Sequence, residues 1–198
     1  MTELKRHTHP PKVVPLPETR RVSWVPVALE FTHQLTVACW TGCLVGLAVV
    51  VVPGLYGTIQ DPNEAAWSCL DLIMRLDFIA GGAGAFLLLT TLLMYLLALR
   101  TSAATLTQTA ILMSMTASAV CNHVLVAPKM AALLRSTPDL LTGTDLIARS
   151  RFEELSRIGM GLLGLQIALG ASLLFLGVRR WYRYIAPTHA PRLSLIGE

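Results

Sequence analysis

An apolar stretch from His33 to Pro53, HQLTVACWTGCLVGLAVVVVP, constrains this chain more than any other feature of its sequence. It contains no acidic or basic residue apart from the histidine at its start. A helix of this length rises about 30 Å, the thickness of the hydrocarbon core of a bilayer. A surface helix of a soluble protein would show a polar stripe with a period of about 3.6 residues, and none is visible between Leu44 and Val52. The stretch is therefore predicted to be a transmembrane helix.

The composition of the 198-residue chain is typical of a protein that lies mostly in a bilayer. Hydrophobic residues make up 54% of the chain and charged residues 14%, whereas a soluble domain has about 25% charged residues. The net charge of +4 is not gathered in a basic cluster with interleaved aromatic residues. Nucleic acid is therefore not an expected partner, and the lipid bilayer is.

Four apolar segments predict an all-α polytopic membrane protein, built as an antiparallel four-helix transmembrane bundle with short polar termini. The bundle is expected to occupy residues 25–180, with helices at about 26–56, 77–99, 104–127 and 158–178. A separate helical segment is expected from Pro62, and the connection over 129–157 has helical ends. No internal repeat is evident in the sequence.

The two ends of the chain are polar and basic. Residues 1–24 form a proline-rich arm, which is either disordered or lies along a partner subunit, and residues 181–198 form a short tail. Because the chain crosses the membrane four times, both termini lie on one side. That side holds ten of the 16 basic residues, namely Lys5, Arg6, Lys12, Arg20, Arg21, Arg100, Arg179, Arg180, Arg183 and Arg192. The positive-inside rule therefore predicts cytoplasmic termini.

Two histidines lie within the predicted spans, where an ionisable side chain is costly and marks a functional candidate. His33 is expected about 9 Å below the cytoplasmic face and His123 about 29 Å below it, so the two imidazoles do not ligate one haem iron. Met94 on the second helix lies near the level of His33, which makes His33 and Met94 a candidate pair of haem ligands. The alternative is that His33 bonds Glu30 or Gln34 at its own end of the helix.

A polar cluster is expected near the outer end of the bundle. It comprises Asp77, Asn122, His123, Lys129 and Arg157. Asp77 either orients His123 or pairs with one of the two cations, and the alternative is a purely structural pair at the membrane interface.

A third candidate site consists of Cys39 and Cys43, one helical turn apart, which suit a soft metal such as Cu(I). Apolar helical cysteines more often serve packing. Gly42 and Gly46 form a GxxxG motif, a feature of close helix contacts. The sequence has no nucleotide-binding loop, no nucleophile beside a base and no HExxH motif, which disfavours an enzyme.

Several short motifs resemble those of one family. His33, Trp40 and Gly42 form H-x6-W-x-G, and later segments are Asn122-His123, Ala127-Pro128-Lys129 and Phe152-x-x-Leu155. With these motifs the chain resembles the bacterial four-helix membrane family of transmembrane-protein-205-like proteins. That family lies near the copper-resistance-D-like superfamily, which also includes the HemJ-type protoporphyrinogen oxidase.

The resemblance covers about residues 28–178. It implies a four-helix bundle in the bacterial inner membrane and, for some relatives, haem b bound from the first helix, here by His33. The chain departs from the family at Ser156, where a histidine is common, and at Gly159, where a serine is common.

The sequence leaves three hypotheses for function. The first is a non-catalytic accessory or structural subunit that packs by its glycine-rich faces against other membrane subunits. The second is a haem b-binding redox protein that acts on a porphyrin or quinone and uses His33. The third is copper handling through the cysteine pair.

Overall fold

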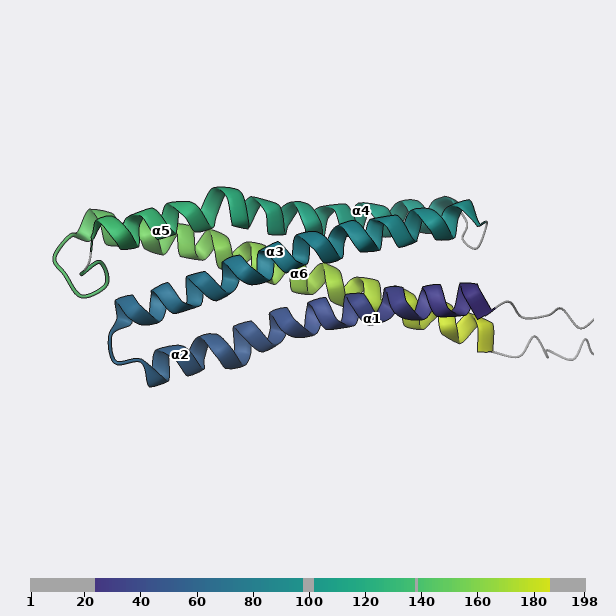
Figure 1. Ribbon diagram of the computed structural model, residues 1–198, viewed down its shortest axis with the longest axis horizontal. Coiled ribbons are helices and arrows are strands. Elements are labelled where there is room, and N and C mark those ends of the chain that lie inside the picture. Colours follow the sequence, from purple (N-terminus) through teal and green to yellow (C-terminus); the bar gives the residue numbers. More distant parts are fainter. Residues whose placement is uncertain (1–23, 98–101, 138, 186–198) are drawn as a thin grey trace, which may run out of the picture.

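The computed structural model describes residues 24–97, 102–137 and 139–185, and this part of the chain is helical with no strand. Its elements form four long rods (Figure 1). They are α1 (Trp24–Gly46), η1 (Leu47–Val51) and α2 (Val52–Thr58); α3 (Pro62–Leu96); α4 (Ser102–Cys121), η2 (Asn122–Val126) and α5 (Ala127–Ser136); and α6 (Leu146–Ile185). All four rods are long and apolar enough to span a membrane, which confirms the predicted fold class. Most of the predicted arm and tail lie outside the described residues, as do residues 98–101 between the second and third rods.

Two helices begin well before the predicted boundaries. The expected segment from Pro62 and the expected helix at 77–99 form one continuous helix, α3, and α6 begins at Leu146 rather than near 158. Polar side chains start both helices: Asp61 accepts a hydrogen bond from the backbone N–H of Asn63, and Asp145 accepts from that of Ala148. These first turns are too polar for the bilayer interior, so the rods extend beyond it on this side.

The first and third rods along the chain each contain a π-helical turn just before a proline. The turn η1 precedes Pro53 and the turn η2 precedes Pro128. A proline lacks the N–H that an α-helix needs, and its ring collides with the carbonyl four residues earlier, at Val49 and Val124 respectively. Widening the preceding turn relieves this collision without breaking the helix.

The rods form a square in which α1 contacts α3 and α6, and α4 contacts the same two helices. Two pairs of neighbouring helices approach closely because one helix of each pair has a glycine at the contact. The side chain of Thr41 on α1 lies against Gly170 on α6, and that of Thr116 on α4 lies against Gly84 on α3, so a Cβ at either glycine would collide with the threonine. Small residues at such contacts let transmembrane backbones pack closely.

The square contains an internal repeat that is not evident from the sequence. When η1 is aligned with η2, Val49 matches Val124 and Pro53 matches Pro128. The same shift along the chain makes buried positions of α1 coincide with buried positions of α4. The pairs are His33 with Gln108, Val37 with Leu112, Trp40 with Met115, Leu44 with Ala119, and Leu47 with Asn122.

A matching shift, fixed by the two threonine-glycine contacts, relates α3 to α6. Buried positions again coincide: Asp77 with Leu163, Ala80 with Gln166, Leu87 with Leu173, and Thr91 with Gly177. The described helices therefore follow the pattern of two similar hairpins, α1 with α3 and α4 with α6, which bury matching positions. Such parallel repeats are known in other membrane proteins.

The bundle exposes an apolar surface on all sides. The most apolar 18-residue windows of the four rods are only 22–39% buried within the protein. Large side chains such as Phe78, Leu89 and Phe175 point outward. Only a bilayer or other membrane helices can cover this surface, so the chain is a membrane protein.

Candidate functional site

The first site residues that the fold brings together are Asp77 and Asn122. Asp77 lies midway along α3, and Asn122 opens the π-helical turn η2 on the adjacent rod. The Asn122 Nδ2–H group donates to Asp77 Oδ2 over 2.6 Å, and both side chains are at least 94% buried. A hydrogen bond to a charged acceptor is short and stronger than a neutral one. The bond ties η2 to α3 at this level of the bundle.

His123 joins this pair, whereas the two cations do not. His123 follows Asn122 directly in η2, and its buried Nδ1 atom has no hydrogen-bond partner among the described residues. Lys129 and Arg157 are exposed, and no described ion pair links either of them to Asp77. The predicted cluster therefore separates into an inner group of three and two surface cations.

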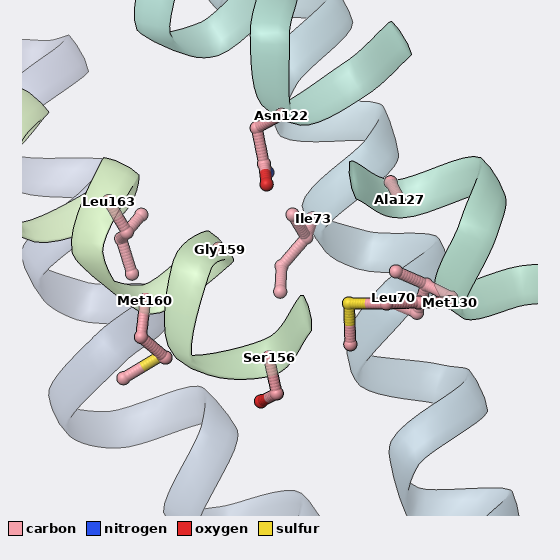
Figure 2. Close-up of a pocket in the computed structure, with 9 residues that line it drawn as sticks. All are labelled: Leu70, Ile73, Asn122, Ala127, Met130, Ser156, Gly159, Met160 and Leu163. Atoms are coloured by element: carbon pink, nitrogen blue, oxygen red, sulfur yellow. The ribbon is translucent and has the colours of Figure 1, made fainter. Parts of the chain in front are cut away.

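A cavity of about 60 Å³ lies beside this group, between α3, α5 and α6 (Figure 2). Its polar lining comes from Asn122, whose amide projects into it, and from Ser156. Ser156 and Gly159, where the sequence departs from the resembled family's pattern, are both lining residues. The remaining wall is apolar and consists of Leu70, Ile73, Ala127, Met130, Met160 and Leu163. Sequence reasoning did not identify this cavity, because its walls come from segments far apart in the chain.

The second site surrounds His33 near the other end of the bundle. His33 Nδ1 lies 3.0 Å from Thr90 Oγ1, and the Thr90 hydroxyl donates its only proton to the Leu87 carbonyl. Thr90 therefore accepts from His33, which fixes the imidazole as the tautomer with its proton on Nδ1. Met94 is also buried, one helical turn beyond Thr90 on the same side of α3. Thr90 and Asp77 are about 20 Å apart along α3, as expected for the two histidine levels.

The surroundings of His33 decide how well a haem fits. A histidine that ligates a metal usually donates its other ring N–H to a protein acceptor, and the bond to Thr90 provides this. However, the neighbouring core residues Val37, Leu87 and Leu112 have no exposed surface, and His33 lines neither of the two described cavities. A porphyrin does not fit between these helices as they are packed. Haem ligation by His33 and Met94 stays a prediction, and no chemistry is derived from it.

The two cysteines of the third candidate site face outward. Cys39 and Cys43 are exposed on α1. Within the described residues no group of three His, Cys, Asp or Glu side chains is placed to hold a metal ion. Both cysteines share an outward face with Gly42 and Gly46, and no atom lies within 4 Å of a Cβ added at either glycine.

No family model, curated protein or solved structure matches the chain.

Proposed function

We propose that the protein is an accessory subunit of a larger assembly in the bacterial inner membrane, without catalytic machinery of its own. One observation carries this proposal. The outward face of α1 between Cys39 and Gly46 consists of small residues, and both of its glycines have open space beside them. At Gly84 and Gly170 a neighbouring helix fills the same kind of space. Other glycines such as Gly82 are open too, but α1 combines two open glycines in a GxxxG motif with two exposed cysteines on one face.

The outer end of the first rod supports the same interpretation. Helix α2 contains no buried residue and contacts α3 but not α6. Its equivalent in the second hairpin, α5, contacts both helices and buries Ala127 and Ala131. The first rod therefore has an uncovered apolar face along most of its length. A transmembrane helix of another subunit suits this face, because small residues allow close backbone contact in a bilayer.

The proposal includes the orientation predicted from the basic residues, with both termini in the cytoplasm. The start of α1 and the end of α6 lie at the same end of the bundle in Figure 1. They are joined there by an ion pair of 3.3 Å between Arg180 and Glu30. A reporter that folds only in the cytoplasm, fused to the C-terminus, should be active. An inactive cytoplasmic reporter together with an active periplasmic one contradicts this orientation. We further propose kinship with the transmembrane-protein-205-like family, on the motifs described above.

The experiment is purification from native membranes in a mild detergent, followed by mass determination and identification of co-purifying subunits. The double variant Gly42→Leu/Gly46→Leu adds two side chains to the outward face, where they have room, and should release the partners while the bundle stays folded. Gly82→Leu on α3, also exposed with open space beside it, is the matched control. A monomeric wild-type protein, or unchanged partners in the double variant, contradicts the proposal.

The same preparation tests the haem hypothesis. The favouring observation is the contact of His33 Nδ1 with Thr90, because a ligating histidine usually bonds a protein group through its other ring nitrogen. A Soret band that is lost in His33→Ala would assign haem to this residue. Protein purified from haem-replete cells without such a band would exclude the hypothesis, and metal analysis of that protein tests copper binding.

A further inference from the structure

The internal repeat provides a comparison for the Asp77–Asn122 pair within the same molecule. The equivalent positions in the other half are Leu163 and Leu47, both buried in the apolar core. A bundle of this geometry therefore accepts two leucines at this level. The fold does not require a carboxylate and an amide there, although burying a carboxylate at membrane depth is costly.

The hydrogen bond between the two side chains determines which atom faces the cavity. Because a carboxylate only accepts, Asn122 must use its NH₂ group toward Asp77, which leaves the carbonyl oxygen Oδ1 on the other side. That oxygen lies 3.3 Å from the position that a Cβ of residue 159 would occupy. Gly159 thus leaves room in front of Asn122 Oδ1, and Figure 2 shows the amide directed into this space.

The lining selects a ligand by its chemistry. Asn122 Oδ1 is an acceptor and the Ser156 hydroxyl is a donor or an acceptor, while the other seven lining residues are apolar or lack a polar side chain. The nearby Asp77 disfavours an anion. A cation would exchange its water shell for one carbonyl and one hydroxyl in an apolar wall, which is unfavourable. A neutral hydroxyl group satisfies both polar residues.

The position of the cavity indicates where such a ligand comes from. The exposed cations Arg75, Lys129 and Arg157 mark the membrane surface nearby, and cationic side chains occur at this depth. Met160, at the edge of the cavity, is 52% exposed on the apolar outer surface. The cavity therefore lies where the polar ends of bilayer amphiphiles meet their apolar chains.

We propose that this cavity binds the hydroxyl group of a neutral, long-chain alcohol that resides in the bilayer. The hydroxyl donates to Asn122 Oδ1, and the chain leaves past Met160 toward the lipid. Asp77 is a positioning residue, which holds the amide of Asn122 with its oxygen toward the cavity.

The probe is a long-chain alcohol with a photoreactive diazirine next to its hydroxyl end, added to protein in phosphatidylcholine nanodiscs. Its methyl ether, which has the same chain but no donor, is the matched ligand. We expect the alcohol to label cavity residues and the ether to label them up to about tenfold less, the equivalent of one neutral hydrogen bond. Equal labelling by the two ligands overturns the proposal.

Three variants complete the test. Asn122→Leu removes the acceptor, and Gly159→Leu fills the space while both polar groups remain, so each should reduce alcohol labelling to the level of the ether. Leu47→Asn, at the equivalent position of the other hairpin, should leave labelling unchanged. If Asn122→Leu does not fold, Gly159→Leu decides alone, and wild-type labelling in a folded Gly159→Leu variant overturns the proposal.

Discussion

The Asp77–Asn122 pair allows a double-mutant cycle whose outcome follows from the internal repeat. Asn122→Leu removes a hydrogen bond to a buried carboxylate, and Asp77→Leu leaves the Asn122 NH₂ group buried without an acceptor. A lost bond to a charged group costs about 1.5–3 kcal/mol. Measured interhelical bonds in membranes are weaker, about 0.6 kcal/mol on average and at most about 1.7. Each single variant should therefore lose about 1–2 kcal/mol.

The double variant Asp77→Leu/Asn122→Leu reproduces the leucine pair found at Leu163 and Leu47. It should lose less than either single variant, because no polar group is left without a partner. The assay is reversible unfolding in mixed micelles with increasing dodecyl sulfate, followed by circular dichroism. A double variant whose loss equals the sum of the two single losses would refute the equivalence of the hairpins at this level.

Two further predictions concern packing and the second site. Gly84→Leu should destabilise the bundle by about 1–3 kcal/mol, because the new side chain meets Thr116. Gly82→Leu is the control and should change the midpoint of the same detergent titration little. Equal losses of stability in the two variants would contradict the contact between Gly84 and Thr116. Thr90→Val removes the acceptor of the His33 Nδ1–H and should lower the free energy of unfolding by about 1–3 kcal/mol. The double variant Thr90→Val/His33→Leu should recover part of that loss in the same unfolding assay.

The sequence predicts the four rods well because apolar length is a direct requirement of the bilayer. It predicts a helix from Pro62 but separates it from the apolar segment at 77–99, and it places the start of α6 too late, because the segments after Pro62 and Leu146 are more polar than the spans. Side-chain caps and ion pairs one turn apart, such as Arg149 with Glu153, start these segments, and tertiary contacts at Ala66, Leu70 and Phe152 bury one face of them.

The internal repeat cannot be recognised in the sequence, for a different reason. Its halves share few identical residues, such as Pro53 and Pro128, and they place unlike side chains at equivalent positions, such as His33 and Gln108. What they share is which positions are buried and where glycine meets threonine. These features depend on contacts between helices, which a single sequence does not display.

The candidate sites show the same division. Asp77, Asn122 and His123 could be grouped from their expected depth, and the structure joins Asp77 to Asn122, the residue before His123 in η2. Depth alone does not reveal the direction of a side chain, and the contact of His33 with Thr90 on α3 could not be predicted from it. The cavity could not be predicted, since it depends on the absence of a side chain at Gly159 opposite Asn122.

The outward face of α1 is the proposed binding surface for another membrane subunit. Cys43 lies on this face and is exposed, so it can carry a cysteine-reactive photocrosslinker in a variant whose other exposed cysteines, Cys39 and Cys121, are replaced by alanine. Irradiation in native membranes should give a covalent adduct with one other membrane protein, identified by mass spectrometry. Efficient labelling of Cys43 with no protein adduct in those membranes would contradict the account.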